Sequence, residues 1–331
     1  MKISILGTGS WGTALGQVLA DNGQNVILWG VDIDEVVDIH LYHQNSKYFP
    51  NVHLNNQLDA SNNLEDIYDS DVIVLATPSF TIKELSQNIS KKMEKKVIVV
   101  NVAKGFDPET HERLSVVIEK NFAKDKLKAI VNLIGPSHAE EVILRMETAV
   151  SAVSEDDEAA AVIQEIFSND YFRVYRLNDV IGAEIGAAAK NVIALASGIC
   201  SGINLGDNAR AALMTRGLAE IRRFGLALGG KDETFLGLTG VGDLIVTCTS
   251  THSRNFQAGY AIGKEDSAKM FWEDNVKTVE GVRACEIIYL EAKKRKISMP
   301  ITEQIYEVLY NGTKPSEAVP KLMTRDLKPE F

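Results

Sequence analysis

The chain has 331 residues, of which 45% are hydrophobic, and this length and composition predict two packed domains. Its formal net charge of −10 argues against nucleic acid and anionic membranes as partners. No uninterrupted apolar run approaches the roughly 18 residues that span a bilayer, so we expect no membrane insertion. The first residues lead directly into a predicted strand, so we expect no targeting segment and a cytoplasmic protein.

The three cysteines, Cys200, Cys248 and Cys285, are far apart and lack the CxxC or Cys/His spacing of a metal site. Such usage is typical of a reducing compartment. We therefore expect buried structural thiols and no bound metal.

The N-terminal segment has the pattern of a dinucleotide-binding βαβ unit. An apolar strand over residues 2–6 leads into GTGSWG at residues 7–12 and then into a helical repeat. In such units Gly7 permits the tight turn, Gly9 lets the backbone approach a pyrophosphate, and Gly12 lets the helix pack closely on the strand. The free N–H groups at the helix start face the phosphates. A glycine-rich turn in an unrelated α/β domain is the alternative.

Strand and helix patterns continue to alternate up to about residue 177. Further apolar strands are predicted over residues 26–29, 72–76, 97–100 and 129–134. Uninterrupted apolar strands favour a parallel sheet covered on both faces, and ligands bind such sheets beyond the C-terminal strand ends. The segments after three of these strands are therefore candidates for a pocket: Thr77-Pro78, Lys104-Gly105 and Gly135-Pro136-Ser137.

From residue 179 the pattern is helical. Helices are predicted over residues 181–202, 208–228, 281–295 and 301–309, and no strand pattern of comparable strength follows. We therefore predict an α/β protein with a Rossmann-type, doubly wound sheet domain over residues 1–178 and an all-helical domain over residues 179–331.

Lys190 is the most unusual residue of the helical part. It lies in GAAAKNVIA at residues 186–194, where no neighbour three or four positions away can form an ion pair with it. Desolvation disfavours an ammonium in small, apolar surroundings, so such a lysine loses its proton more easily, which suits general acid/base chemistry. The alternative is a lysine that extends to the surface, and the pattern alone leaves both open.

A second cluster lies in GLTGVGDLIVT at residues 237–247. Its three glycines indicate close backbone approach, and Asp243 and Thr247 would share one face of a helix. Asp243 as a simple helix N-cap is the alternative. Arg254 follows shortly and offers a planar fork for a phosphate or carboxylate, although a single arginine in a loop is more often solvated.

Taken together, these segments closely resemble the bacterial NAD(P)-dependent glycerol-3-phosphate dehydrogenases from the first strand to residues 315–326. The matching blocks are GTGSWGTAL from Gly7, NVAKG from Asn101, GPSHAEEV from Gly135, AAAKNVIALASGICSGINLGDNARAALMTRGLAEI from Ala187, GLTGVGDLIVTCTSTHSRN from Gly237 and VEGVRA from Val279. The resemblance implies a Rossmann-type domain and a helical domain like that of 6-phosphogluconate dehydrogenases. It also implies a homodimer. The implied reaction is reversible hydride transfer between NAD(P)H and dihydroxyacetone phosphate, giving sn-glycerol 3-phosphate for phospholipid synthesis.

The resemblance further implies roles for individual residues. Lys190 resembles the catalytic acid/base on the C2 oxygen, and Asp243 and Thr247 would order this lysine and the substrate. The implied substrate contacts are Lys104, Gly135, Ser137, Asn191, Ser253, Arg254 and Asn255, with the phosphate held by Arg254 and Asn255. The implied cofactor contacts are Gly7, Gly9, Ser10, Trp11, Gly12, Val31, Asp32, Lys104, Ala139, Arg254, Val279 and Glu280. A positive cluster of Lys104, Lys190 and Arg254 would also stabilise the alkoxide that develops during hydride transfer.

Two departures from the family pattern bear on the choice between NAD and NADP. Many relatives carry Arg or His after the second strand, where this chain has Val31 and Asp32. Asp32 lies roughly 20 residues after the last glycine of the motif, the usual place for an acid that bonds the ribose 2′-OH. Phe256 stands where a further basic residue is common. Both departures favour NAD slightly, although some NADP-using relatives keep an acid at the first position.

Two other functions fit parts of the sequence. Another dehydrogenase of the 6-phosphogluconate or hydroxyacid group would share the Rossmann start and the Lys-Asn pair, but not the Asp243 block with Ser253-Arg254-Asn255. An NAD-sensing binding protein would need no proton donor, so Lys190 and Asp243 argue against it. The sequence therefore favours a glycerol-3-phosphate dehydrogenase over both.

Overall fold

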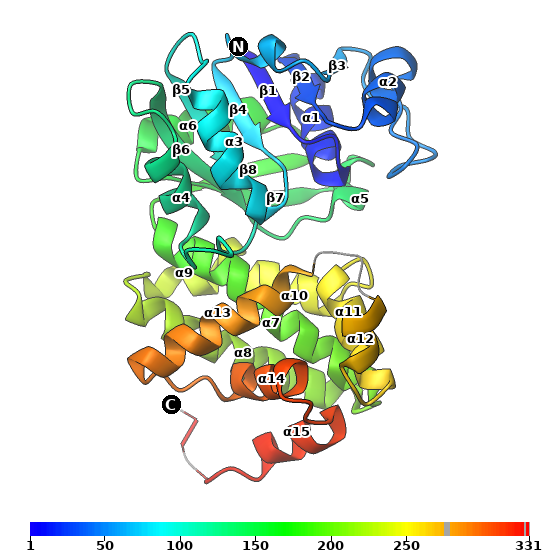
Figure 1. The fold of residues 1–331 in the computed structure, drawn as a ribbon, viewed down its shortest axis with the longest axis vertical. Coiled ribbons are helices and arrows are strands. Elements are labelled where there is room, and N and C mark those ends of the chain that lie inside the picture. The colour runs from blue at the N-terminus through cyan, green and yellow to red at the C-terminus, as the bar shows by residue number, and fades with distance from the viewer. Residues whose placement is uncertain (275–278, 328, 331) are drawn as a thin grey trace. The chain divides into compact units, whose positions relative to one another are not determined.

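The protein forms two compact units, Met1–Glu184 and Ile185–Phe331, in a computed structural model that describes residues 1–274, 279–327 and 329–330 (Figure 1). The boundary predicted from the sequence, between residues 178 and 179, lies just before helix α7 (Val180–Gly202). The two units divide inside this helix, after its first turn.

The first unit is built on one eight-stranded sheet with the order β3-β2-β1-β4-β5-β6-β7-β8. The strands are β1 (Lys2–Leu6), β2 (Asn25–Trp29), β3 (Leu58–Ser61), β4 (Val72–Leu75), β5 (Val97–Asn101), β6 (Leu127–Ile134), β7 (Thr148–Val153) and β8 (Phe172–Leu177). The five strands expected from the apolar runs are confirmed to within two residues. The order reverses direction between β1 and β4, so the sheet is doubly wound as predicted.

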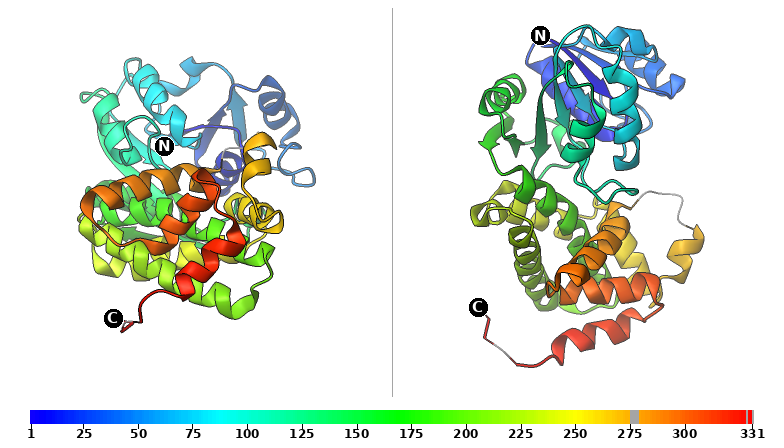
Figure 2. Two further views of the ribbon diagram at one scale, coloured as in Figure 1. Left: turned by 60° about the horizontal axis from the view of Figure 1, so that its bottom comes forward. Right: turned by 60° about the vertical axis from the view of Figure 1, so that its left-hand side comes forward.

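Helices cover both faces of this sheet, as Figure 2 shows. They are α1 (Ser10–Asp21), α2 (Ile33–Tyr42), α3 (Ile82–Ser90), α4 (Leu114–Asn121), α5 (Ala139–Val142) and α6 (Asp157–Phe167), with short 3₁₀ turns η1 (Leu64–Ile67) and η2 (Ser79–Thr81). Successive residues of β4 point to opposite faces: Val72 and Val74 join a core with α1 and α6, whereas Ile73 and Leu75 join a second core with α3 and α4. Burial on both faces explains why this strand is apolar throughout.

One pair of strands departs from the parallel arrangement. β6 and β7 are antiparallel, with Ile134 opposite Ser151. The connection between them contains only the four-residue helix α5, so the chain turns back instead of making the longer crossover that a parallel pair needs. β8 follows β7 in parallel at the edge of the sheet, where Phe172 and Val174 are buried and Arg173 is exposed.

The first turn of α7 is held within the first unit by Glu184. This buried carboxylate accepts hydrogen bonds from the Ser115 N–H at 2.9 Å and from Arg113 Nη1 at 2.7 Å, both at the start of α4. Burial raises the pKa of Glu184, while Arg113 and Ser115 oppose this shift. These contacts explain why the division between the units falls after residue 184.

The second unit is helical throughout its described residues. It contains the rest of α7, then α8 (Gly206–Ala227), α9 (Asp232–Leu236), the π-helical segment η3 (Leu238–Gly242), α10 (Asp243–Thr249), α11 (Arg254–Lys264), α12 (Lys269–Asp274), α13 (Glu280–Arg295), α14 (Pro300–Tyr310) and α15 (Pro315–Met323). The four helices predicted from the sequence are confirmed to within two residues. All three cysteines are buried free thiols, as expected.

Helix α7 is long and apolar enough to cross a membrane by length and composition alone. This helix contains no long uninterrupted apolar run, because Glu184 and Lys190 divide it. Within the described residues it is the one such helix, and 89% of its apolar window is buried inside the protein. Such burial is typical of the core helix of a folded domain.

Helix α7 packs against α11 with almost no side chains between the two backbones. A Cβ atom placed on Gly198 would lie 2.1 Å from the Phe256 carbonyl oxygen, and one on Gly259 would lie 2.0 Å from the Leu195 carbonyl oxygen. The small residues of α7 therefore admit a neighbouring helix. This crossing places the start of α11 beside the middle of α7.

Candidate active site

The loop between β1 and α1 has the geometry of a phosphate-binding turn. Gly7 has φ +124°, which L side chains rarely adopt, and a Cβ on Gly12 would lie 2.0 Å from the Gly7 carbonyl oxygen. A Cβ on Gly9 would meet nothing within 4 Å, so open space lies in front of the backbone there. Gly9 is also the N-cap of α1, whose first N–H groups have no partner within the helix. The glycine pattern and the helix start therefore fit a dinucleotide pyrophosphate.

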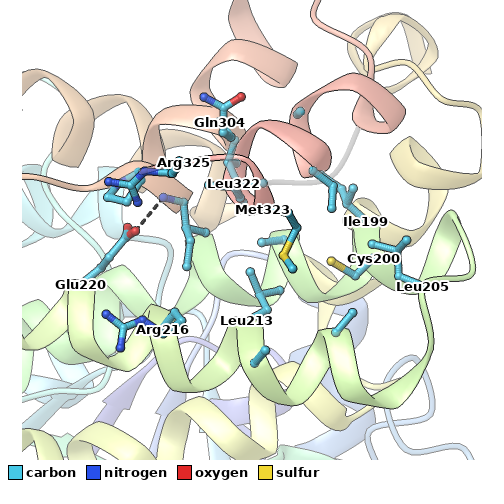
Figure 3. A pocket seen from close by; sticks show the side chains of 18 of the residues that line it. Ile199, Cys200, Leu205, Leu213, Arg216, Glu220, Gln304, Leu322, Met323 and Arg325 are labelled. Atoms are coloured by element: carbon cyan, nitrogen blue, oxygen red, sulfur yellow. Dashed lines mark hydrogen bonds between the residues drawn. The ribbon is translucent and has the colours of Figure 1, made fainter. Parts of the chain in front are cut away.

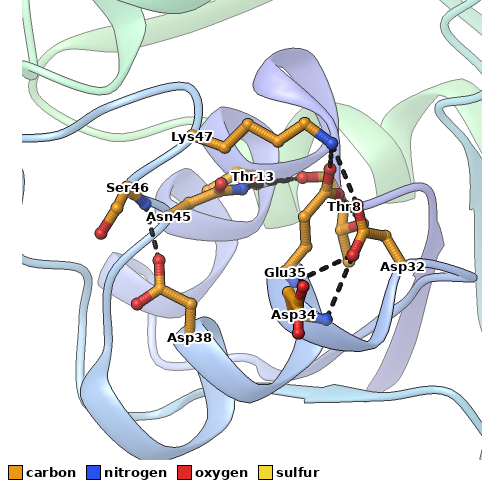
Figure 4. Close-up of polar contacts among 9 residues, drawn as sticks. All are labelled: Thr8, Thr13, Asp32, Asp34, Glu35, Asp38, Asn45, Ser46 and Lys47. Carbon is orange, nitrogen blue, oxygen red and sulfur yellow. Dashed lines mark hydrogen bonds and ion pairs between the residues drawn. The ribbon is translucent and has the colours of Figure 1, made fainter.

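A buried network of hydrogen bonds holds Thr8 of this loop in place (Figure 4). The Asn45 amide donates to the Thr8 carbonyl oxygen and to Thr13 Oγ1, both at 2.8 Å, and Thr8 Oγ1 donates to Glu35 at 2.5 Å. Sequence reasoning missed Asn45, which lies 37 residues from Thr8. No local pattern connects such distant positions, so nothing in the sequence indicated its role.

The segment after β2 carries a charged cluster, also drawn in Figure 4. Asp32 is the N-cap of α2 and accepts hydrogen bonds from the N–H groups of the next turn. Lys47 Nζ lies 3.0 Å from Asp32 Oδ2 and 2.5 Å from Glu35 Oε1. Its ion pair lowers the pKa of Asp32, and the same contacts raise the pKa of Lys47. Val31 is 82% exposed. The acid expected at the ribose position is therefore present, but a lysine partly neutralises it.

The C-terminal ends of β5 and β6 bring three predicted residues together. Lys104 Nζ donates to the Gly135 carbonyl oxygen at 3.2 Å, and Ser137 Oγ donates to the same oxygen at 3.1 Å. A Cβ on Gly135 would lie 2.8 Å from the Val150 Cα, so a glycine is required there for packing as well. The predicted pocket segments 104–105 and 135–137 are thus neighbours in this unit.

Two buried asparagines that were not singled out beforehand organise these strand ends. Asn101 donates to Asn132 Oδ1 at 2.9 Å, and its own Oδ1 accepts from the Ala103 N–H at 3.2 Å. These bonds fix the turn that leads to Lys104. The signal was available for Asn132, because it is the one polar residue in the apolar run 129–134.

In the second unit Lys190, Asp243 and Thr247 form a buried cluster. They are 4%, 1% and 5% exposed. Lys190 Nζ lies 2.5 Å from Asp243 Oδ1 and 2.6 Å from Thr247 Oγ1. The Thr247 hydroxyl donates to the Asp243 carbonyl oxygen at 2.6 Å, which leaves its lone pairs directed at the ammonium. The surface position that was the alternative for Lys190 is therefore wrong.

The position of Asp243 follows from the glycine-rich segment before it. Gly242 is the N-cap of α10 and Asp243 is its first residue, so the N-cap role considered for Asp243 is also wrong. A Cβ on Gly240 would lie 2.2 Å from the Phe235 carbonyl oxygen, which confirms the close backbone approach predicted for this segment. Asp243 and Thr247 share one face of α10, as their spacing indicated, and that face meets Lys190.

Next to this cluster, Asn255 joins three helices. Its amide donates to Asn191 Oδ1 on α7 at 3.0 Å, and its Oδ1 accepts from the Gly281 N–H on α13 at 2.9 Å. Both ends of the Asn255 side chain therefore have protein partners. Asn191 and Asn255 are buried one position after Lys190 and Arg254, so they hold the backbone that carries those two cations.

Comparison with known proteins agrees with this geometry. Residues 2–160 match the N-terminal domain of NAD-dependent glycerol-3-phosphate dehydrogenases, and residues 179–320 match their C-terminal domain. The chain belongs to the NAD-dependent glycerol-3-phosphate dehydrogenase family. It is 46% identical over 330 residues to glycerol-3-phosphate dehydrogenase [NAD(P)+] of Bacillus thuringiensis (strain Al Hakam), covering 99% of this chain and 97% of the relative.

Solved structures of glycerol-3-phosphate dehydrogenases share the whole fold. The Coxiella burnetii enzyme has a TM-score of 0.90 at 35% identity, with 98% of this chain and 99% of that chain covered. The Saccharomyces cerevisiae enzyme has a TM-score of 0.84 at 25% identity, with the same coverage. These relatives confirm the predicted Rossmann-type and helical architecture. Membership of the family also confirms an NAD(P)-dependent dehydrogenase that interconverts dihydroxyacetone phosphate and sn-glycerol 3-phosphate.

The remaining positions singled out by the resemblance to glycerol-3-phosphate dehydrogenases lie at helix starts. Ser10 and Trp11 open α1, Ala139 opens α5, and Glu280 opens α13 after its N-cap Val279. Helix starts expose backbone N–H groups, which suits contacts to phosphates.

Arg254 lies in a helix and not in the loop that we considered. Ser253 is the N-cap of α11, and its Oγ accepts from the Phe256 N–H at 3.2 Å. Arg254 is therefore the first residue of this helix, with an exposed side chain, whereas Phe256 is buried. The serine before a helical repeat was a usable sequence signal for this helix start.

Proposed function

We propose that Lys190 is the acid/base of dihydroxyacetone phosphate reduction, acting on the C2 oxygen. The observation that carries this proposal is the buried Lys190, Asp243 and Thr247 cluster in a helix otherwise lined by small residues. The product, sn-glycerol 3-phosphate, would serve phospholipid synthesis in the cytoplasm, and the working form would be a homodimer. The family relation supports these three statements.

The chemistry divides between the cofactor and the side chains. A reduced nicotinamide, when bound, supplies the hydride that reaches C2. Lys190 Nζ gives a proton to the C2 oxygen in this direction and removes it in the reverse direction. Asp243 stabilises the ammonium form and holds its direction, and Thr247 accepts a second Nζ hydrogen bond. In the proposed complex an N–H of the Lys190 ammonium would be directed at the C2 oxygen of the substrate.

For substrate binding we propose that Arg254 and the N-terminus of α11 hold the phosphate. An exposed guanidinium and the first backbone N–H groups of an eleven-residue helix offer charge-assisted hydrogen bonds to one anion. Asn191 and Asn255 position these groups through their buried hydrogen bonds. Ser253 contributes as the N-cap of the same helix.

We assign Lys104, Gly135 and Ser137 to the substrate as well. Lys104 Nζ and Ser137 Oγ already converge on the Gly135 carbonyl oxygen, at the strand ends where ligands bind doubly wound sheets. The positive charge of Lys104 would also stabilise an alkoxide.

For the cofactor we assign the glycine loop with Ser10 and Trp11 to the pyrophosphate. Val31 and Asp32 would lie at the adenosine ribose. Ala139, Val279 and Glu280 would be further contacts, together with Lys104 and Arg254. Asp32 favours NADH over NADPH, and the Lys47 ion pair reduces this preference without removing it.

A steady-state assay with dihydroxyacetone phosphate and NADH tests the role of Lys190. We expect Lys190→Ala to lower kcat by about 10²- to 10⁴-fold while NADH binding, followed by fluorescence, stays within about threefold of wild type. Lys190→Arg should be nearly as slow, because it keeps the charge but does not release a proton at neutral pH. The exposed Lys264→Ala is the matched control. A Lys190→Ala enzyme with more than about a tenth of the wild-type kcat would remove the lysine from this role.

A further inference from the structure

A cavity lies within the helical unit, between α7, α8, α14 and α15 (Figure 3). Its volume is about 540 Å³, within the range of roughly 300–1,000 Å³ that small-molecule sites occupy. Ile199 and Cys200 of α7 line it, but Lys190 does not. Ile199 follows Lys190 by nine residues, which places it on about the opposite side of α7. The cavity is therefore separate from the catalytic cluster.

The cavity is long and its lining is mostly apolar. Its walls include Ile199, Leu205, Leu213, Ile305, Val308 and Leu322. Along α8 the lining extends from Asn208 to Arg223, a distance of roughly 22 Å at 1.5 Å per residue. A lipid tail spans half of a bilayer core, about 15 Å, so a single extended acyl chain would fit this length.

The two ends of the cavity differ in polarity. Ile199, Cys200 and Leu205 lie at one end in Figure 3, and Arg216 and Arg325 lie toward the other. Arg223 follows Arg216 by two turns of α8 and so lies on the same face. A chain with a formal net charge of −10 thus places three arginines in the lining of one cavity, and one of them, Arg223, donates to the Ser298 carbonyl oxygen.

Among the described residues of the lining, Glu220 is the one acid, and it already has hydrogen-bond partners. Its carboxylate accepts hydrogen bonds from the Ile301 N–H at 2.6 Å and from the Thr302 N–H at 3.2 Å, so it caps α14. Arg216 Nη1 lies 3.6 Å from Glu330 Oε1, an exposed ion pair that stabilises little and that another anion can replace. Gln304 lines the cavity too, and its buried Oε1 has no hydrogen-bond partner among the described residues.

We propose that this cavity binds a single-chain anionic amphiphile, with the alkyl chain between α7, α8, α14 and α15 and the anionic head group at the arginines. The length and apolar lining select one extended chain, and the guanidinium groups select a carboxylate or phosphate head. A free fatty acid and a lysophosphatidate share this chemistry. The site is independent of the acid/base role assigned to Lys190.

Titration calorimetry with decanoate, dodecanoate and tetradecanoate, each below its micelle concentration, tests the chain. We expect one site per chain and an affinity that rises by up to about fourfold per added methylene. Ala212→Phe would place an aromatic ring at an exposed position of α8 that lines the cavity, and should weaken tetradecanoate binding at least tenfold. Ala211→Phe, one position away and outside the lining, is the matched control and should bind as wild type does.

The head group is tested with charge variants of both partners. Tetradecyltrimethylammonium should bind at least tenfold more weakly than tetradecanoate, and Arg216→Gln with Arg325→Gln should remove most of this difference. A lysophosphatidate of the same chain length that binds more tightly than tetradecanoate would identify a phosphate head, and the reverse order a carboxylate. Circular dichroism and turnover of dihydroxyacetone phosphate check that each variant is folded.

Three results would overturn the proposal. One is the absence of saturable binding to the wild-type chain. Another is equal affinity of tetradecanoate for Ala212→Phe and Ala211→Phe. The third is Ala212→Phe dissociating an oligomer, by light scattering, while the wild type binds no amphiphile, since the cavity would then accept a second copy of the chain.

Discussion

Two lysines of this protein form ion pairs of similar length with carboxylates, but one lysine is buried and the other is exposed. Lys190 and Asp243 are 2.5 Å apart, with side chains 5% and 1% exposed. Lys47 lies 2.5 Å from Glu35 and 3.0 Å from Asp32, but 56% of the Lys47 side chain is exposed. Water and salt screen the exposed Lys47 and Asp32 of the second cluster, whereas its Glu35, at 8% exposed, and the whole first cluster are shielded. The distance between the charges therefore does not determine how much an ion pair contributes to the free energy of unfolding, because burial matters as much.

The difference also bears on function. A buried pair is fixed in direction, so Asp243 can hold Lys190 ready for proton transfer, and removing either partner leaves an uncompensated charge. An exposed pair can rearrange around a ligand, so Lys47 can turn from Asp32 toward a phosphate at little cost. We expect disruption of the first pair to affect folding and turnover, and disruption of the second to act mainly on cofactor choice, with a smaller loss of stability from the buried Glu35.

The largest effect is expected from Asp243→Asn. It leaves the Lys190 ammonium buried without its carboxylate, so we expect a loss of about 3–5 kcal/mol in the free energy of unfolding. The kcat should fall by at least about tenfold, because the lysine is no longer held in place. Chemical denaturation and steady-state kinetics measure both quantities.

A double variant separates these two effects. Lys190→Met with Asp243→Leu removes both charges and should regain most of the lost stability while remaining inactive. If the double variant is no more stable than Asp243→Asn, the buried pair is not the source of the loss.

Glu220 is an intermediate case, a buried carboxylate that pairs with backbone N–H groups instead of a lysine. Burial raises its pKa to about 7, from a usual value near 4.5. The folded state therefore keeps the proton in a pH range where the unfolded state has lost it. This contribution to stability is fully present below about pH 4.5 and is lost as pH rises through about 7.

Glu220→Gln stays neutral at every pH. Between pH 4.5 and pH 8 the free energy of unfolding of wild type should therefore fall relative to that of the variant, by at most about 3 kcal/mol. Any difference between the two proteins that does not depend on pH adds to this change. Denaturation curves at several pH values measure the gain, with the exposed Glu317→Gln as control. A difference in the free energy of unfolding between Glu220→Gln and wild type that stays constant with pH would contradict the raised pKa of Glu220.

The sequence predicted the fold well where the signal is local. The apolar run of β4 and the glycines of residues 7–12 each report on their own neighbourhood, so strand positions and the phosphate turn could be inferred. The antiparallel return of β7 was not foreseen, because it depends on how little helix the connection 135–147 contains. Strand β8 alternates buried and exposed residues at the sheet edge and so lacks the apolar run of the central strands.

The site was predictable from residue types but not from local patterns alone. Lys190 is conspicuous because nothing nearby in sequence can pair with it, yet its partner Asp243 is 53 residues away. Only the resemblance to a family joined the two. The same holds for Asn45 under the glycine loop. Tertiary pairs of this kind depend on how the helices cross, as in the glycine contacts of α7 with α11.

A smaller effect, on binding alone, is expected from Arg254→Ala. Like Lys47, Arg254 is an exposed cation, but the proposed partner is the substrate phosphate. The variant loses a charge-assisted hydrogen bond of about 1.5–3 kcal/mol, so the KM for dihydroxyacetone phosphate should rise by the corresponding factor. The KM for unphosphorylated dihydroxyacetone should stay almost unchanged. Arg295→Ala, an exposed arginine on α13, is the control. Equal losses for the two substrates would place Arg254 at the cofactor instead.

The smallest effect is expected at Lys47. In the wild type we expect kcat/KM to favour NADH over NADPH by about tenfold, since tenfold discrimination needs only a modest charge difference at the ribose. Lys47→Met would leave Asp32 and Glu35 unneutralised beside a 2′-phosphate, so it should widen the preference by about a further tenfold, through the KM for NADPH. Raising the salt concentration should reduce this widening of the preference, because the Lys47 and Asp32 side chains are exposed.

Val31→Arg should narrow the preference for NADH over NADPH, since it adds a cation at an exposed position. Val31→Arg should leave stability nearly unchanged. Lys47→Met should lower it, but by less than Asp243→Asn, because Glu35 is only 8% exposed and loses a partner that is itself largely in solvent. A wild-type enzyme that prefers NADPH would show that Asp32 does not control the choice, and Tyr48, beside Lys47, would be the next position to vary.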